Sequence, residues 1–119
     1  MPRVLIVSNE LVTRQGLRRL FEEECVFEIC GEAESDAAAL ELTENLSPSL
    51  IVLDAVDGLP KRLVQKLLEM VPQTPIFLLM EKYSVAIEKA ALACGVTAVF
   101  SKLDDLEALA ANARAITQE

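Results

Sequence analysis

Short apolar runs alternate along this chain with longer segments in which apolar residues recur every three or four positions. Such short runs are typical of strands buried on both faces of a parallel sheet, and the longer spacing is typical of helices that pack one face against it. Strands are predicted at residues 3–7, 27–33, 50–54, 76–80 and 97–101. Helices are predicted at residues 11–24, 37–46, 60–71 and 83–94, and from Asp104 or Asp105 to Ile116.

This alternation predicts a doubly wound α/β fold, with a parallel sheet covered by helices on both faces. The second strand alternates polar and apolar residues, which indicates a half-exposed strand at the edge of the sheet. In an open α/β sheet, the residues that follow the strands share one rim, and ligands bind there. The rim residues predicted in this way are Ser8, Asn9, Asp54, Met80, Glu81, Ser101 and Lys102.

The length of 119 residues fits a single domain, residues 1–119, that is large enough to bury a core. Hydrophobic residues make up 52% of the chain, which excludes a disordered segment. No apolar run approaches the roughly 18 residues of a membrane span, and the apolar start is too short for a signal peptide. We therefore expect a cytoplasmic protein with no contact to a membrane.

The composition excludes several kinds of chemistry. The net charge of −8 argues against direct nucleic-acid binding by this domain, because that needs a basic surface. The chain has no histidine, so catalytic Ser-His-Asp and Cys-His arrangements and histidine metal sites are excluded. The three cysteines lack metal-binding spacing and are expected to be reduced thiols.

Asp54 is the strongest candidate for a functional residue. It ends the apolar run at residues 50–54, and a turn and a helical pattern follow it. A carboxylate at the end of a central strand lies where α/β proteins place their chemistry. The alternative is an ordinary loop aspartate, since aspartate is favoured before helices for its backbone hydrogen bonds.

Several other segments surround Asp54 in a characteristic order. They are residues 3–7 (RVLIV), 14–20 (RQGLRRL), 48–54 (PSLIVLD), 73–75 (QTP), 93–98 (ACGVTA) and Lys102. In order and spacing they resemble the receiver domains of bacterial two-component response regulators, most closely those attached to helix-turn-helix output domains. The resemblance covers nearly the whole chain. It implies a flavodoxin-like (βα)5 three-layer sandwich with strand order 2-1-3-4-5.

The resemblance also implies a signalling module rather than an enzyme, in which a sensor histidine kinase passes a phosphoryl group to the aspartate that matches Asp54. Lys102 matches the lysine that binds the phosphoryl oxygens. Cations are needed at such a site because a carboxylate must approach a phosphorus surrounded by anionic oxygens. Receivers usually supply an acidic pair that holds Mg²⁺, a hydroxyl after the fourth strand and an aromatic residue on the fifth.

This chain departs from that pattern at four positions. The acidic pair falls on Ser8 and Asn9, and neither is charged. The hydroxyl falls on Met80 and the aromatic residue on Val99, so both switch positions are changed. Phe100 is adjacent to Val99, but alternation along a strand directs it to the other face of the sheet.

The expected Mg²⁺ site is weak or absent, with Asn9, Asp54 and the carbonyl of Val56 as its remaining ligands. A complete site carries about −2 before the ion binds, whereas Asp54 and Lys102 together sum to about zero, and Mg²⁺ prefers several carboxylate oxygens. Three nearby acids could restore a carboxylate but are expected to be solvated loop residues: Glu10, Asp57 and Glu81.

Two hypotheses remain open from the sequence. In one, the domain is a phosphorylatable receiver with a weakened metal site. In the other, it is a pseudoreceiver in which Asp54 and Lys102 form a structural ion pair, and the fold serves as an interaction or dimerisation module. The expected partner in either case is a sensor histidine kinase or another signalling protein, with a homodimer as an alternative, and an output domain could follow the chain.

Overall fold

The computed structural model describes residues 2–25, 27–56 and 58–116. Within these residues, one parallel sheet is formed by β1 (Arg3–Val7), β2 (Glu28–Ala33), β3 (Leu50–Ala55), β4 (Ile76–Met80) and β5 (Ala98–Ser101). The helices are α1 (Leu11–Leu20), α2 (Asp36–Leu46), α3 (Lys61–Met70), α4 (Val85–Ala93) and α5 (Leu106–Ile116). The strand order β2-β1-β3-β4-β5 confirms the predicted topology and places β2 at an edge.

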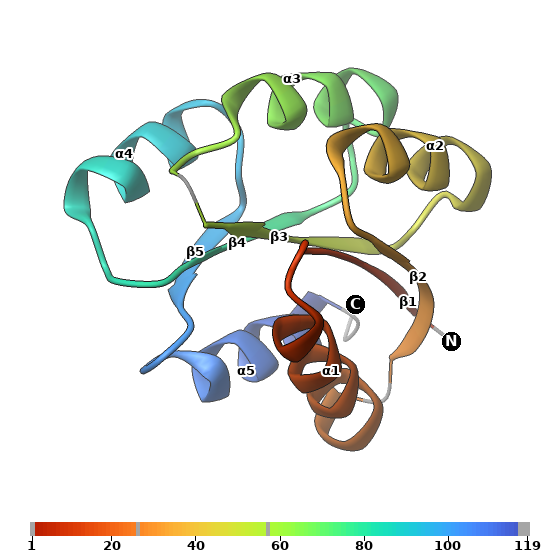
Figure 1. The fold of residues 1–119 in the computed structure, drawn as a ribbon, viewed down its shortest axis with the longest axis horizontal. Coiled ribbons are helices and arrows are strands. Elements are labelled where there is room, and N and C mark those ends of the chain that lie inside the picture. Colours follow the sequence, from red (N-terminus) through yellow and green to blue (C-terminus); the bar gives the residue numbers. More distant parts are fainter. Residues whose placement is uncertain (1, 26, 57, 117–119) are drawn as a thin grey trace.

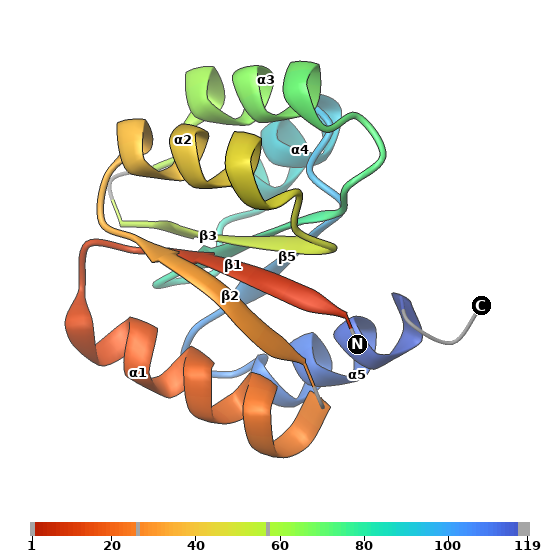
Figure 2. The ribbon, with the colours of Figure 1, turned by 90° about the vertical axis from the view of Figure 1, so that its right-hand side faces the viewer.

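The helices cover the sheet in two layers. Helices α1 and α5 lie on one face, and α2, α3 and α4 lie on the other (Figure 1). The view turned by 90° shows the same three layers, with the sheet between them (Figure 2). This is the predicted three-layer sandwich, and it brings the residues after the strands to one rim. None of the described helices is long and apolar enough to cross a membrane.

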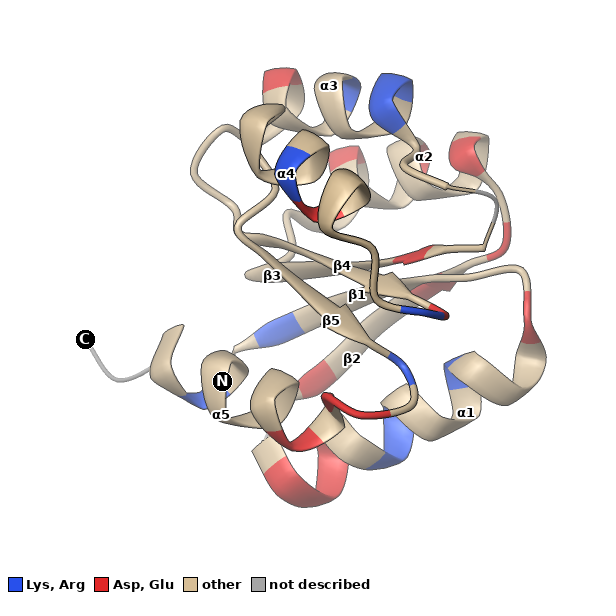
Figure 3. Cartoon of the chain, turned by 90° about the vertical axis from the view of Figure 1, so that its left-hand side faces the viewer, with Lys and Arg blue, Asp and Glu red and all other residues tan. Residues whose placement is uncertain are grey.

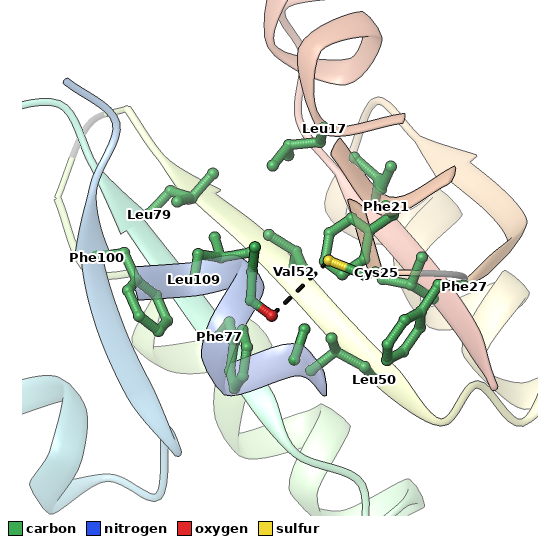
Figure 4. Packing of buried hydrophobic residues seen from close by; sticks show 14 residues of the cluster. Leu17, Phe21, Cys25, Phe27, Leu50, Val52, Phe77, Leu79, Phe100 and Leu109 are labelled. Atoms are coloured by element: carbon green, nitrogen blue, oxygen red, sulfur yellow. Dashed lines mark hydrogen bonds between the residues drawn. The ribbon is translucent and has the colours of Figure 1, made fainter. Parts of the chain in front are cut away.

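The core beneath α1 and α5 is built around aromatic side chains (Figure 4). Phe77 and Phe100 pack with their ring centroids 5.1 Å apart, and Phe21 and Phe27 pack at 5.2 Å. Val99 instead packs against the core on the opposite face of the sheet. The two neighbours on β5 therefore face opposite ways, as strand alternation predicts.

Most helix boundaries shift by a residue or two from the predicted ones, and two of the shifts have a visible structural reason. The first helix ends at Leu20 and is followed by a π-helical turn, Phe21–Cys25, whose first and last side chains are buried. The fourth helix begins at Val85 rather than Tyr83, because Ser84 caps it: its hydroxyl accepts a hydrogen bond of 3.2 Å from the backbone N–H of Ile87.

Acidic residues outnumber basic ones in the chain by 19 to 11, and Figure 3 marks the positions of both kinds on the ribbon. A basic segment follows the carboxyl end of β5 (Figure 3). The sequence there includes Lys102, whose backbone N–H donates a 2.8 Å hydrogen bond to the carbonyl of Met80. This bond extends the pairing of β4 and β5 by one residue, so the position of Lys102 at the rim is fixed by the sheet itself.

Candidate functional site

Asp54 lies near the carboxyl end of β3, which continues one residue beyond it to Ala55. Leu50 and Val52 face the core beneath α1 and α5, so alternation places the Asp54 side chain on the same face. Its side chain is 0% exposed. A buried carboxylate is costly unless it has partners, so its contacts define the site.

The structure brings Asp54 and Lys102 into direct contact, although 48 positions separate them in the chain. The Lys102 ammonium lies 2.7 Å from Oδ1 of Asp54 and donates a hydrogen bond of 2.8 Å to Oδ2. Ser8 donates a second hydrogen bond, of 2.7 Å, to Oδ2. The buried carboxylate therefore has both a cation and a hydroxyl donor next to it.

Ser8 is held in place by hydrogen bonds to its hydroxyl and to its backbone carbonyl. It is buried, and its hydroxyl accepts a hydrogen bond of 3.1 Å from the backbone N–H of Glu10. Its carbonyl accepts a 2.9 Å hydrogen bond from Arg14, whose guanidinium also pairs with Glu32 and Glu34. The orienting role of Arg14 was missed from the sequence, which gives no sign that a helical arginine reaches back to the end of β1.

The sequence predicted that Glu10 is a solvated loop acid; it does lie exposed before α1, but it also pairs with Lys102, which was not predicted. Its carboxylate lies 3.0 Å from the Lys102 ammonium, and it also accepts a hydrogen bond of 3.1 Å from Thr13. Thr13 in turn accepts a 3.4 Å hydrogen bond from Lys102. Glu10 directly precedes α1 at the rim, and that position was the only signal in the sequence for this contact.

The contacts between these groups act on their pKa values. The hydrogen bond from Lys102, with further help from Thr13, lowers the pKa of Glu10 below its ordinary value. Partial burial alone would lower the pKa of Lys102, but hydrogen bonds to Asp54 and Glu10 outweigh burial and raise it. At neutral pH Lys102 is therefore a cation and Glu10 an anion.

The remaining predicted site residues lie apart from this network. Asn9 is exposed and makes no hydrogen bond to another described residue, and together with Asp54 and Val56 it lines a pocket of about 260 Å³. Met80 is buried at the end of β4 and has no hydroxyl to donate. Val99 is half-buried. Glu81 is exposed, and Asp57 lies outside the described residues.

The side chains at the rim do not fit a Mg²⁺ site of the kind that the resemblance implies. The pocket beside Asn9 and Val56 is lined by three described carboxylates, of Glu34, Asp36 and Asp54. Of these, Asp54 alone has a buried carboxylate, and its oxygens already contact Lys102 and Ser8. The Glu10 carboxylate is directed to Lys102. Among the described residues, no three acidic or cysteine side chains gather closely enough to hold a metal ion. Mg²⁺ prefers several oxygen ligands with negative charge, and the described residues of this rim do not bring such ligands together.

The sequence model of the response regulator receiver domain matches residues 4–114. The chain belongs to this family. Receiver domains are signalling modules, and in general they bind Mg²⁺ at the phosphorylation site. Because Ser8 and Asn9 stand at the positions of the acidic pair, this chain differs from the family in the residues that usually bind Mg²⁺.

Curated relatives support the assignment. The receiver domain is 43% identical over 54 residues to the transcriptional regulatory protein YdfI of Bacillus subtilis, a match that covers 45% of this chain and 25% of that protein. It is 31% identical over 120 residues to a Pseudomonas aeruginosa protein provisionally named a transcriptional regulator, covering 98% of this chain and 56% of the relative. The chain thus spans about half or less of the length of these relatives.

Solved structures share the fold at low identity. A LuxR-family DNA-binding response regulator from Staphylococcus aureus superposes with a TM-score of 0.84 at 17% identity, covering 98% of both chains. The isolated receiver domain of RcsB from Salmonella enterica serovar Typhimurium superposes with a TM-score of 0.81 at 23% identity, covering 93% of this chain and 87% of that one. These likenesses establish the receiver fold, and the site must be judged from its own residues.

Proposed function

We propose that this domain is a pseudoreceiver, a receiver that acts through protein contacts without phosphorylation of Asp54. One observation carries the proposal: Ser8, at a position where receivers usually carry an acid, donates a 2.7 Å hydrogen bond to the buried Asp54 carboxylate that Lys102 also contacts. In this proposal Asp54 and Lys102 form a structural ion pair, which Ser8 completes.

Phosphorylation would require Asp54 to act as a nucleophile towards an anionic phosphoryl group. Cations must offset the charge that gathers at such a centre. Here one lysine is shared between two carboxylates, so the site keeps about one negative charge and repels an incoming phosphoryl group. Met80 offers no hydroxyl to report a phosphoryl group to the rest of the domain.

In this proposal the domain is cytoplasmic and works as an interaction module of a response regulator. Its partner is a sensor histidine kinase, another signalling protein or a second copy of the domain. Its net charge of −8 disfavours direct DNA binding by residues 1–119, so gene regulation, which the names of two relatives suggest, would belong to a separate output domain.

A second candidate is a receiver that is phosphorylated weakly on Asp54. It is favoured by the survival of both Asp54 and Lys102 in direct contact, and by the pocket of about 260 Å³ beside them. In this case Asn9 and the Val56 carbonyl would be the remaining metal ligands. The two candidates differ in one measurable outcome, which is the formation of an aspartyl phosphate.

The test is to incubate the domain with Mg²⁺ and acetyl phosphate and to measure its intact mass. We expect no phosphate adduct on the wild-type domain. The matched comparison is the double variant Ser8→Asp/Asn9→Asp, which restores the acidic pair and should gain Mg²⁺ binding and an adduct. The same variant with Asp54→Asn should lose that adduct. A mass increase of one phosphate on wild-type Asp54 would overturn the pseudoreceiver proposal in favour of the second candidate.

A further inference from the structure

Three acceptors from the described residues surround the Lys102 ammonium. A lysine ammonium has three N–H donors. The acceptors around Lys102 are the Asp54 carboxylate, Glu10 Oε1 at 3.0 Å and Thr13 Oγ1 at 3.4 Å. These three acceptors come from the end of β3, the start of α1 and its first turn. The group that would bind phosphoryl oxygens in other receivers therefore already has as many acceptors within the domain as it has N–H donors.

Glu10 is held in this position from two sides. Its backbone N–H donates to the Ser8 hydroxyl at 3.1 Å, and its Oε1 accepts a hydrogen bond of 3.1 Å from Thr13. Glu10, Thr13 and Lys102 thus form a closed ring of hydrogen bonds. A carboxylate placed in advance loses less conformational entropy on pairing than one on a free side chain.

Glu10 and Asp54 contribute differently to this cluster. The Asp54 side chain is 0% exposed, whereas the Glu10 side chain is 48% exposed and reaches Lys102 from the solvent side of the rim. Asp54 is thus the buried partner of the lysine. Glu10 occupies the outer side, from which an external anion would have to approach.

We propose that Glu10 is a built-in anionic ligand of Lys102, and that it takes the place of the tetrahedral oxyanion that this lysine would otherwise bind. The inference rests on the proposed function and deepens it, because it names the group that keeps the pseudoreceiver site satisfied without phosphate. It also assigns a latent site. Once the Glu10 charge is removed, Lys102 binds a phosphate-like oxyanion from solution.

The probe is inorganic phosphate, titrated into the isotope-labelled domain while backbone amide shifts are followed by NMR. The variant is Glu10→Gln, which keeps the size of an exposed side chain and removes its charge. We expect this variant to bind phosphate about fivefold more tightly than wild type, with the largest shifts at Lys102 and Thr13, because one unit of repulsion near the lysine is removed.

The matched control is Glu34→Gln. Glu34 is also exposed and makes an ion pair, but its partner is Arg14 rather than Lys102. The Glu34→Gln variant changes the net charge of the domain by the same amount as Glu10→Gln. Because Glu34 pairs with Arg14, the variant should leave phosphate binding at Lys102 unchanged. An equal gain in both variants, no gain in Glu10→Gln, or shifts that map away from Lys102 would each overturn the inference.

The acetyl phosphate reaction tests the pseudoreceiver proposal, and the phosphate titration tests the role of Glu10, so each can be contradicted without the other. If wild type is phosphorylated on Asp54 but Glu10→Gln still gains phosphate binding, the pseudoreceiver proposal is wrong and the role of Glu10 stands. If wild type is not phosphorylated and Glu10→Gln gains nothing, the pseudoreceiver proposal stands and Glu10 is only a surface ion pair.

Discussion

The two sides of Asp54 are built differently. On the closed side, formed by Ser8, Glu10 and Lys102, each polar group of the cluster has a partner within the domain. On the open side, formed by the pocket that Asn9 and Val56 line, the Asn9 side chain is exposed and hydrogen-bonds to none of the described residues. The residues of the closed side hydrogen-bond to one another and to Asp54, whereas the Asn9 side chain on the open side faces solvent.

This difference explains how a receiver can lose its acidic pair and keep its phosphoacceptor position. A buried carboxylate without a partner costs several kcal/mol, so Asp54 is tolerated only while Lys102 and Ser8 accompany it. Loss of the acid at position 9, on the open side, leaves no buried group unpaired, and Ser8, which replaces the other acid, donates a hydrogen bond to Asp54. A receiver can therefore lose the acids that bind Mg²⁺ while the ion pair between Asp54 and Lys102 remains.

The largest expected effect follows removal of the cation on the closed side. Lys102→Met leaves the Asp54 carboxylate buried with only the Ser8 hydroxyl beside it. We expect the free energy of unfolding to fall by about 2–3 kcal/mol, below the full cost of breaking a buried pair because Lys102 is 17% exposed. Urea denaturation followed by circular dichroism measures this change.

Lys89→Met is the control for Lys102→Met, because Lys89 is exposed on α4. It removes the same charge and should change the free energy of unfolding by less than about 0.5 kcal/mol. Similar losses in the two lysine variants would mean that the ion pair with Asp54 contributes no more than a surface charge.

The fold was predictable because its signals are local. Buried parallel strands need continuous apolar runs, so β3 and β4 could be identified from their residues alone. Their order then placed Asp54 and Lys102 at one rim. The apolar spacing of residues 60–71 predicts a core face of α3 made of Leu63, Leu67, Met70 and Val71. Leu63 and Leu67 are buried, but Met70 is 37% exposed and Val64, outside that set, is fully buried.

The site was less predictable because it depends on where long side chains reach. Asp54 and Lys102 follow from strand ends, whereas the contact of Glu10 with Lys102 depends on a rotamer at the start of α1. The reach of Arg14 to the Ser8 carbonyl depends on how α1 lies against β1. Neither side-chain geometry can be predicted from the sequence alone.

A smaller loss is expected when the hydroxyl on the closed side is removed. Ser8→Ala deletes the donor to Asp54 and the acceptor for the Glu10 N–H. We expect a cost of about 1–2 kcal/mol in the free energy of unfolding, because the bond to a charged acceptor is lost while Lys102 still neutralises it. Combining Ser8→Ala with Lys102→Met tests coupling: strictly additive losses would contradict a shared network.

The smallest effect on the free energy of unfolding is expected for Asn9, which is adjacent to Ser8 in the sequence but lies on the open side. Asn9→Ala truncates an exposed side chain that hydrogen-bonds to no described residue, so the free energy of unfolding should change by less than about 0.5 kcal/mol. The measurement is the same urea titration, run beside Ser8→Ala, so that two adjacent polar residues are compared under identical conditions. A loss in Asn9→Ala as large as that in Ser8→Ala would show that Asn9 stabilises the rim, and the division into a closed and an open side would be wrong. A loss confined to Ser8→Ala would place the stabilising contacts of Asp54 on the side of Lys102 alone.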